Sequence, residues 1–471
     1  METDSVKIIA ERVFGKPVLV VTQLPVSGSS RRYYRLNFSD NSSILAAYNS
    51  EIRENEAFIQ FASHFKEQGL PVPEILHVES DQKLYFINDL GNTTLYNFII
   101  EEGHIKPEKQ AFYYQKAIDY LLKFQFSKPP DYQYCFPRAA FDRTSMMWDL
   151  NYFKYYFLKL AYISFDEQKL EHDFIAWCDT LSQIPSHYFL YRDFQSRNIM
   201  INGDELSFLD FQGGRRGALQ YDLASLLYDA KANLSDTFRK EMLDYYCQQL
   251  EQKQLGSPGL FRNYYYHFVL MRIMQAFGAY GYRGFYEKKP HFLQSVPLAA
   301  ANLVKLLTEI NFQNAFPELS NVWNQIATKF TSASQKESID EKLHIKISSF
   351  SFKKGYPEGH PEHGGGFIFD CRALPNPGRE EKYKHLTGLD DDVVRFLEDS
   401  REVSYFIDAC ADLVCLSTDN YLGRGFSQLA IAFGCTGGQH RSVYCASQME
   451  KALKSKYGND IHVSIVHREL Q

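Results

Sequence analysis

The stretch Tyr191-Arg192-Asp193-Phe194-Gln195-Ser196-Arg197-Asn198, with Leu209-Asp210-Phe211-Gln212 beginning eleven residues after Asn198, decides the expected fold. An aspartate and an asparagine five residues apart, then a second aspartate after a short apolar strand, are what phosphoryl transfer to a hydroxyl group requires. We expect Asp193 to be the catalytic base. We expect Asn198 and Asp210 to hold Mg²⁺, which prefers carboxylate and amide oxygens, so ATP and Mg²⁺ are the predicted cofactors.

The local sequence also predicts how these residues meet. The apolar runs 199–201 and 206–209 flank the turn Asn202-Gly203-Asp204, which is typical of a β-hairpin that would place Asn198 opposite Asp210. The alternative is that these residues only form turns, since Asp and Asn are common there.

Composition limits the classes of function. The 471 residues are too many for one ordinary domain, and Lys+Arg at 51 against Asp+Glu at 57 argues against a nucleic-acid surface as the main function. The eight cysteines have no C-x-x-C spacing, which favours free thiols in a reducing cytosol. No apolar run reaches the roughly 18 residues of a membrane span, and the chain starts without a signal pattern. We therefore expect a cytoplasmic protein without a membrane partner.

Changes in residue pattern predict the domains. Residues 1–90 alternate like strands around one helix, and residues 91–330 are mostly helical. A polar run at 331–342 is typical of a linker, and a strand pattern starts the region 343–471. The early helix is indicated by acidic residues followed by apolar residues at helical spacing: Glu51, Glu54, Glu56, Phe58, Phe61, Ala62 and Phe65.

The block 213–227 after Gln212 resembles the aminoglycoside phosphotransferase family, especially its anomeric kinases of N-acetylmuramate and N-acetylglucosamine. In that subgroup a glutamine follows the Asp-Phe pair, as Gln212 does here, and Arg-Asp-[Tyr/Phe]-Gln precedes the asparagine. The resemblance implies an α+β bilobal, protein-kinase-like phosphotransferase at 1–330, with 1–90 as its N-lobe. It also implies that Gln195 and Gln212 contact a sugar substrate and that Asp222 is structural.

The nucleotide contacts are expected in the N-lobe. Residues 27–36 resemble the subgroup's loop over the phosphates, where small residues let backbone N–H groups approach an anion, and 84–91 resemble the hinge beneath adenine. An ordinary polar turn is the alternative for the loop. The expected contacts are Ser29, Arg31, Arg32, Phe86 and Ile87.

Two features depart from the wider family. The third strand, 44–48, has no lysine, a lack that the amino-sugar kinases share, so Arg31 or Arg32 is expected to supply the charge for the phosphates. The usual histidine of the catalytic loop is Tyr191, which suits packing more than chemistry. Acceptor contacts are harder to place in the helical lobe; Asp142 and Arg143 are our candidates, with core packing as the alternative.

A second site is predicted near the C-terminus. The strand 429–434 leads into Cys435-Thr436-Gly437-Gly438-Gln439-His440-Arg441-Ser442 and then a helix, an arrangement that presents N–H groups to an anion. Arg441 and His440 would add side-chain donors. A tight turn with a surface arginine is the alternative. The spacing from Cys435 to Arg441 also matches cysteine phosphatases, with Asp390 as the acid to test.

The region 343–471 resembles the C-terminal domain of RapZ, the RNase adapter protein. The matching segments are 350–355, 369–377, 386–390, 434–443 and 466–470. The resemblance implies a small α/β domain that binds glucosamine 6-phosphate, with a possible RNA or protein partner. The implied phosphosugar contacts are Arg372, Thr436, Gly437, His440 and Arg441. RapZ begins with a P-loop domain, whereas this chain has no G-x-x-x-x-G-K-[ST] motif.

The sequence therefore predicts an ATP- and Mg²⁺-dependent kinase of an amino sugar, in cell-wall recycling, joined to a phosphosugar-binding regulatory domain. An aminoglycoside or small-alcohol kinase would use the same catalytic residues. A non-catalytic, nucleotide- and phosphosugar-sensing adapter of RapZ type is favoured by Tyr191 and the missing lysine. All three functions remain open from the sequence.

Overall fold

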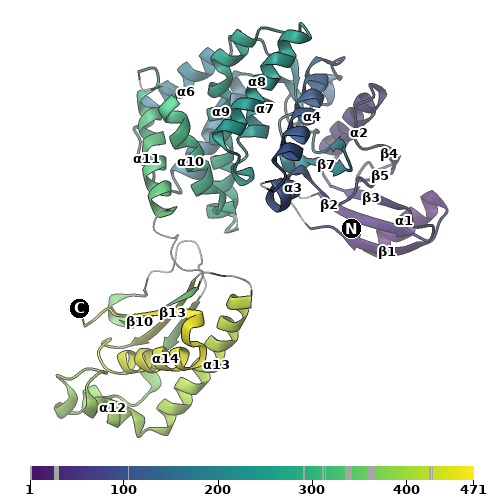
Figure 1. The fold of residues 1–471 in the computed structure, drawn as a ribbon. Helices are drawn as coiled ribbons and strands as arrows, with labels where there is room; N and C mark the ends of the chain where they lie inside the picture. Colours follow the sequence, from purple (N-terminus) through teal and green to yellow (C-terminus); the bar gives the residue numbers. More distant parts are fainter. Residues whose placement is uncertain are drawn as a thin grey trace. The chain divides into compact units, whose positions relative to one another are not determined.

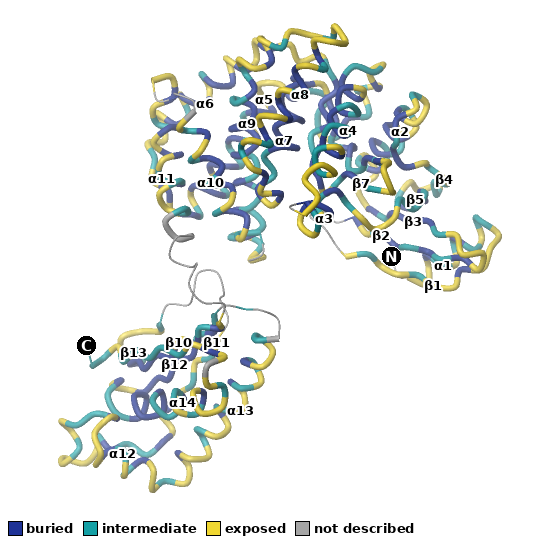
Figure 2. Tube along the Cα trace, viewed as in Figure 1, coloured by how far each residue is buried: buried dark blue, intermediate teal, exposed yellow. Residues whose placement is uncertain are grey.

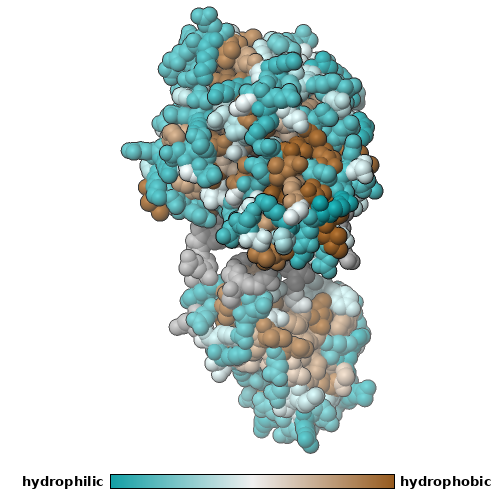
Figure 3. Space-filling model, turned by 90° about the vertical axis from the view of Figure 1, so that its right-hand side faces the viewer, coloured by the Kyte–Doolittle hydropathy of each residue, from teal (hydrophilic) through white to brown (hydrophobic). Residues whose placement is uncertain are grey.

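The chain forms two compact units, Met1–Ser334 and Gln335–Gln471, each with its own apolar core (Figures 1 and 2). The computed structural model describes residues 3–25, 31–103, 105–289, 292–309, 312, 314–334, 342–357, 366–423, 426 and 428–470. Within these ranges, none of the helices combines the length and apolarity that crossing a membrane requires. Apolar residues gather in patches on one otherwise hydrophilic face (Figure 3).

The N-lobe is an antiparallel five-stranded sheet in the order β1-β2-β3-β5-β4. Its elements are α1 (Thr3–Phe14), β1 (Val18–Gln23), β2 (Arg32–Phe38), β3 (Ser43–Tyr48), α2 (Ile52–Glu67), β4 (Ile75–Val78) and β5 (Leu84–Asn88). The sheet alternates its side chains between two faces, so α1 covers one apolar cluster and α2 covers another. The N-lobe is therefore a sheet held between two helices.

Helix α2 brings an acidic residue towards the second lobe. It buries Phe58, Phe61 and Phe65, as their helical spacing predicts. The Glu51 carboxylate caps its start by accepting the Arg53 N–H at 3.4 Å. The opposite side of its first turn presents Glu54, which the packing leaves only partly exposed.

The second lobe is mostly helical, with two small strand pairs at its edge. Helix α9 is buried along most of its length and packs against α5 and α7 (Figure 2). The helices are α3 (Leu95–Phe98), α4 (Pro107–Phe126), α5 (Arg143–Phe153), α6 (Glu167–Leu181), α7 (Gln220–Leu227), α8 (Asp236–Gln252), α9 (Pro258–Gly281), α10 (Ser295–Glu309) and α11 (Pro317–Ser334). The strands are β6 (Tyr188–Leu190), β7 (Ile199–Asn202), β8 (Glu205–Phe208) and β9 (Arg215–Gly217).

Helix α11 extends to Ser334 and so covers 331–334, which the composition assigned to a linker. The Thr331 hydroxyl donates to the Ala327 carbonyl at 2.6 Å, one turn earlier in the helix. A small polar residue is accommodated in a last helical turn in this way. Residues 335–341 of the predicted linker lie outside the described residues.

The C-terminal unit is a parallel four-stranded sheet in the order β11-β12-β10-β13. Its strands are β10 (Leu343–Ser351), β11 (Gly366–Asp370), β12 (Gln428–Cys435) and β13 (Ile461–His467), and its helices are α12 (Asp391–Glu398), α13 (Arg401–Gly423) and α14 (Arg441–Tyr457). The central strand β10 is almost wholly buried. In a parallel sheet the loops that follow the strands gather at one edge, and the predicted anion loop lies there, between β12 and α14.

Candidate functional site

The segment after β6 is clamped by a buried carboxylate. Asp222, in the first turn of α7, accepts the Tyr191 N–H at 2.7 Å and the Arg192 N–H at 2.9 Å. Burial raises the pKa of Asp222 to about 7, although both N–H donors lower it. Asp222 therefore fixes the backbone that leads into Asp193, which is the structural role expected for it.

Tyr191 and Arg192 then turn the chain. The buried Tyr191 hydroxyl donates to the Leu209 carbonyl at 2.6 Å. Arg192 has a left-handed φ of 82°, and its guanidinium donates to Asp149 at 2.8 Å while lying over two aromatic rings. A non-glycine residue holds such a conformation only when its surroundings fix it. Tyr191 thus joins the two halves of the site through packing and one hydrogen bond.

Asp193, Asn198 and Asp210 come together as predicted. The Asn198 side-chain N–H donates to the Asp193 carbonyl at 2.9 Å and to Asp210 Oδ2 at 3.2 Å. The β7–β8 hairpin pairs as expected, and the Leu209 N–H donates to the Asn198 carbonyl at 2.9 Å. Asp210 itself has a left-handed φ of 68°, which turns its carboxylate back towards Asn198.

The charges at this point favour a cation. Desolvation raises the pKa of Asp210, and repulsion by the neighbouring Asp193 carboxylate raises it further. The carboxylate and amide oxygens of Asp210 and Asn198 are ligands that Mg²⁺ prefers, so the residues fit that ion. In the ranges that the structure covers, no cluster of three or more His, Cys, Asp or Glu side chains offers another metal site.

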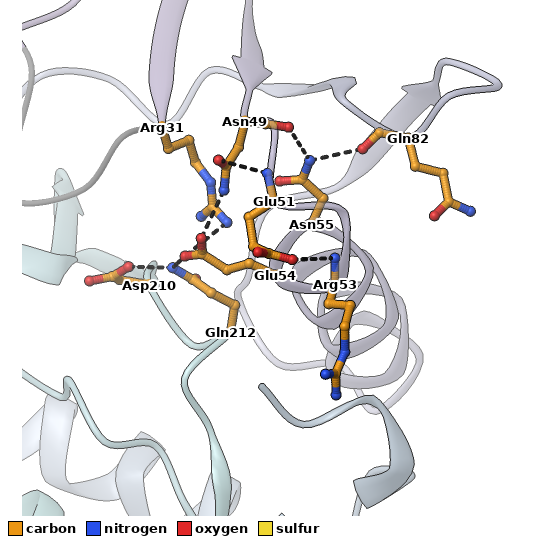
Figure 4. Close-up of polar contacts among 9 residues, drawn as sticks. All are labelled: Arg31, Asn49, Glu51, Arg53, Glu54, Asn55, Gln82, Asp210 and Gln212. Atoms are coloured by element: carbon orange, nitrogen blue, oxygen red, sulfur yellow. Dashed lines mark hydrogen bonds and ion pairs between the residues drawn. The ribbon is translucent and has the colours of Figure 1, made fainter. Parts of the chain in front are cut away.

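A chain of polar contacts connects the N-lobe to Asp210 (Figure 4). The Arg31 guanidinium is only 3% exposed and lies 3.2 Å from Glu54 Oε1 on α2. The Gln212 amide donates to Asp210 Oδ1 at 2.7 Å and to the same Glu54 oxygen at 3.4 Å. Burial lowers the pKa of Arg31, but Tyr85, Tyr33 and Glu54 together raise it above its ordinary value, so it stays charged. From the sequence, Glu54 was predicted only to belong to an acidic helix start.

A cavity of about 220 Å³ lies between the N-lobe sheet and the hairpin. Four of the predicted site residues line it: Arg31, Ile87, Asn198 and Asp210. Arg35 also lines it and is held by a 2.7 Å ion pair with Asp89, in the predicted hinge. Sequence analysis missed Arg35, whose only signal is a charged residue at an inward position of β2.

Other predicted nucleotide contacts lie elsewhere or outside the described residues. Ser29 lies outside the described residues. Arg32 is exposed at the start of β2 and is not among the residues that line the cavity. The Phe86 ring packs against Phe14 of α1, with ring centres 5.3 Å apart, on the opposite face of the sheet from Ile87.

The predicted acceptor residues have structural contacts of their own. Asp142 caps α5 by accepting the Ser145 N–H at 3.0 Å, and it pairs with Arg138 at 2.6 Å. Arg143 pairs with Asp179 at 2.5 Å on the surface. Elsewhere in α5, Asp149 pairs with Arg192 of the predicted catalytic loop at 2.8 Å.

Gln195 lies inside the catalytic loop. It is 4% exposed, and its side-chain oxygen has no hydrogen-bond partner among the described residues. A buried amide oxygen without a partner costs free energy unless a ligand or water satisfies it. The Gln212 side-chain oxygen likewise has no partner among the described residues, while its amide nitrogen donates to two carboxylates.

The anion loop of the C-terminal unit is closely supported. Gly438 has a φ of +73°, and a side chain there would meet Glu469 and the Ser351 backbone. Thr436 and Gly437 are exposed, and the His440 ring bonds the Tyr383 carbonyl at 2.9 Å. The loop therefore leaves Thr436 and Gly437 accessible to a ligand.

The two arginines expected at this loop differ in exposure and in their hydrogen-bond partners. Arg372 is exposed and forms a forked pair with Asp370 at 2.7–3.0 Å, with its guanidinium over Phe352. Arg441 is buried and donates to the carbonyls of Arg372 and Leu374 at 2.8 and 3.1 Å. Arg441 thus supports the segment that carries Arg372.

The phosphatase alternative has mixed support in this geometry. Burial raises the pKa of Cys435, but the Ser442 and Gly438 donors and the Arg441 charge lower it overall. However, Arg441 donates to backbone carbonyls, and Asp390 is occupied by the Thr387 N–H and hydroxyl, both at 2.7 Å. These Thr387 donors lower the pKa of Asp390, which disfavours its action as an acid.

Comparisons with known families match both units. Residues 21–255 match the phosphotransferase enzyme family, and residues 343–471 match the RapZ C-terminal domain. The chain thus carries a phosphotransferase-type domain of α+β kinase-like fold, followed by an α/β domain of RapZ C-terminal type.

Individual relatives are similar over parts of the chain. A nucleotide-binding protein of Listeria innocua is 38% identical over 129 residues, which are 27% of this chain and 41% of that protein. One from Bacillus cytotoxicus is 39% identical over 132 residues, 28% of this chain and 42% of that protein. The chain thus spans about two fifths of the length of these curated relatives.

Solved structures of low identity also resemble the chain. Amicoumacin kinase hAmiN, in complex with AMP-PNP, Ca²⁺ and Ami, is 12% identical with a TM-score of 0.46, covering 60% of this chain and 86% of that one. A choline/ethanolamine kinase family protein from Mesorhizobium loti is 15% identical with a TM-score of 0.45, covering 70% and 100%.

Proposed function

We propose that the chain is an ATP- and Mg²⁺-dependent small-molecule kinase that phosphorylates the anomeric hydroxyl of an N-acetylated amino sugar. The observation that carries the proposal is the meeting of Asp193, Asn198 and Asp210 beside the cavity lined by Arg31. The match of residues 21–255 to the phosphotransferase enzyme family supports the reaction type. The resemblance around Gln195 and Gln212 supports the sugar as acceptor.

Each residue has a role that follows from its contacts. Asp193 would accept the proton of the acceptor hydroxyl, and the Asp222 clamp keeps its backbone in place. Asn198 and Asp210 would hold Mg²⁺, which would neutralise phosphate charge when bound. Arg31 would compensate phosphate charge in place of the absent strand lysine, because it is buried, charged and lines the cavity.

The C-terminal unit would bind a phosphosugar such as glucosamine 6-phosphate and regulate the kinase. Its match to the RapZ C-terminal domain supports a sugar phosphate as ligand. Thr436 and Gly437 are exposed in the loop, and Arg372 is an accessible guanidinium beside it. An RNA or protein partner of this domain is a further expectation from the same resemblance.

An assay of ADP release with a panel of sugars and aminoglycosides tests the proposal. We expect turnover with an N-acetylated amino sugar, and a fall of at least about a hundredfold in Asp193→Asn with ATP binding retained. Turnover only with aminoglycosides or simple alcohols would mean that the acceptor is one of these compounds and not an amino sugar. Equal turnover by Asp193→Asn would refute the assigned site.

The second candidate is a non-catalytic adapter that senses a nucleotide and a phosphosugar. It is favoured by β3, which carries no lysine, and by Tyr191, whose hydroxyl is occupied by the Leu209 carbonyl. Calorimetry would detect ATP binding in this case as well. Binding without turnover on every acceptor would select the adapter over the kinase.

A further inference from the structure

Gln212 occupies an unusual position between two carboxylates. Its side-chain nitrogen lies 2.7 Å from Asp210 Oδ1 and 3.4 Å from Glu54 Oε1, two residues that come from different lobes (Figure 4). An amide nitrogen carries two N–H donors, so one group can serve both carboxylates. A carboxylate in its place could donate to neither at neutral pH.

Glu54 shares the same oxygen with a cation. Glu54 Oε1 also lies 3.2 Å from the Arg31 guanidinium, and the other carboxylate oxygen accepts the Asn49 amide at 2.8 Å. Arg31 lines the cavity in which the phosphates of a nucleotide would lie, as does Asp210. Arg31, Glu54, Gln212 and Asp210 therefore form one network. Its cationic end, Arg31, and its anionic end, Asp210, line the same cavity.

Arg31 and Gln212 are buried, whereas Glu54 and Asp210 are partly exposed. Arg31 is 3% exposed and Gln212 is 8% exposed, while the Glu54 side chain is 20% exposed. Hydrogen bonds to ionised groups are stronger than neutral ones, and low exposure strengthens them further. One amide thus bonds both the Glu54 and the Asp210 carboxylates.

We propose that Gln212 is a positioning residue that couples Arg31 and Glu54 of the N-lobe to the Mg²⁺ ligand Asp210. This inference rests on the proposed ATP- and Mg²⁺-binding function. A phosphate drawn to Arg31 alters its pairing with Glu54, and Gln212 transmits the change to Asp210. Gln212 then acts on nucleotide and metal binding through its amide nitrogen.

The test measures binding by calorimetry in the full chain, with ATP in excess Mg²⁺ and with ATP in chelator. We expect Gln212→Met to weaken Mg²⁺-ATP binding about tenfold, the loss of a charge-assisted hydrogen bond, with metal-free ATP affinity changed less than twofold. Gln125→Met is the matched control. Gln125 is equally buried but bonds the Leu219 carbonyl and the Tyr246 hydroxyl inside the helical lobe.

A double-mutant cycle with Glu54→Gln separates coupling from simple loss of contacts. If Gln212 acts through Glu54, the double variant binds Mg²⁺-ATP about as weakly as either single variant. Three results would overturn the proposal. The affinity losses of the two single variants multiply in the double variant, Gln212→Met loses as much affinity for ATP without Mg²⁺ as with it, or Gln125→Met loses as much affinity as Gln212→Met. Absence of nucleotide binding by the unmodified chain would instead remove the proposed function itself, and the positioning role with it.

Discussion

At the scale of single residues, Tyr191 stands where the resemblance leads us to expect the histidine of the catalytic loop. The position follows β6 and precedes the catalytic loop, and the phenol hydroxyl reaches the Leu209 carbonyl at 2.6 Å. That contact lies one residue before Asp210, so the tyrosine links the segment after β6 to the segment after β8. Its burial raises its pKa well above the ordinary value, which excludes Tyr191 as a base near neutral pH.

Tyr191→Phe tests this interpretation. Loss of the hydroxyl leaves the Leu209 carbonyl without this donor, so we expect the free energy of unfolding to fall by about 1 kcal/mol. Because Tyr191 takes no part in proton transfer, kcat should fall less than about threefold, well below the effect of removing a general base. Denaturant unfolding and the ADP assay measure both quantities. A loss of kcat comparable to Asp193→Asn would give the phenol a chemical role.

His267 provides a residue-scale prediction about pH. Its ring nitrogen accepts the Trp177 N–H at 3.1 Å, and burial lowers the pKa of His267 to about 4. A histidine that stays neutral in the fold costs stability once the unfolded chain takes up a proton. Stability should therefore be unaffected by this group above about pH 6.5 and should fall as pH drops towards 4, by about 3 kcal/mol in total.

The matched variant is His267→Gln, which keeps an acceptor for Trp177 but does not titrate in this range. Urea unfolding of both proteins between pH 7 and pH 4 gives the difference in slope. We expect the two stability curves to diverge below about pH 6.5. Parallel curves would mean that His267 keeps an ordinary pKa in the fold.

The residues that the sequence predicted best are those whose partners are close along the chain. Asn198 and Asp210 meet because a two-strand hairpin joins them, and hairpin and turn chemistry can be identified locally. Glu54 and Gln212 are 158 residues apart, and only the packing of α2 against the second lobe brings them together. No local pattern encodes such a contact, so Glu54 was missed.

At the scale of elements, the face of the strand on which a residue lies decides whether its side chain can reach the cavity. The hinge strand β5 was identified from the sequence, but Phe86 and Ile87 point to opposite faces, as neighbours in a strand must. Asp142 and Arg143 were chosen as acceptor contacts, yet one caps α5 and the other pairs on the surface. Both contacts are structural. They gave no guide to Asp149, the residue of the same helix that pairs with Arg192.

The loop before α14 depends on another glycine, and this gives a prediction at the same scale. A side-chain carbon at Gly388 would lie 2.2 Å from the His440 carbonyl oxygen and 2.6 Å from the Tyr444 nitrogen, both backbone atoms. Gly388→Ala should therefore destabilise the C-terminal unit by about 2 kcal/mol, because a packed backbone cannot shift freely. Gly437→Ala is the control, since its added carbon meets nothing within 4 Å. Equal melting temperatures for both variants would contradict this close approach.

At the scale of the whole molecule, the two apolar cores define two folding units. The cluster around Phe58, Phe211 and Trp177 belongs to Met1–Ser334, and the cluster around Ile347 and Phe433 belongs to Gln335–Gln471. The change from helical to alternating patterns near Leu343 allowed the sequence to predict two domains. The sequence placed the end of the helical region at residue 330, but α11 extends to Ser334, into a polar segment that resembles a linker.

Two cores imply two unfolding transitions, each shifted by its own ligand. A ligand that binds only a folded unit stabilises it by about 2.7 kcal/mol at a hundred times its dissociation constant. In scanning calorimetry, Mg²⁺-ATP should raise the transition of Met1–Ser334, and glucosamine 6-phosphate should raise that of Gln335–Gln471. Arg372→Ala should abolish only the second shift, since Arg372 is exposed and its loss spares the core. If glucosamine 6-phosphate also raises the transition temperature of Met1–Ser334, the two units are coupled. Regulation of the proposed kinase requires such coupling.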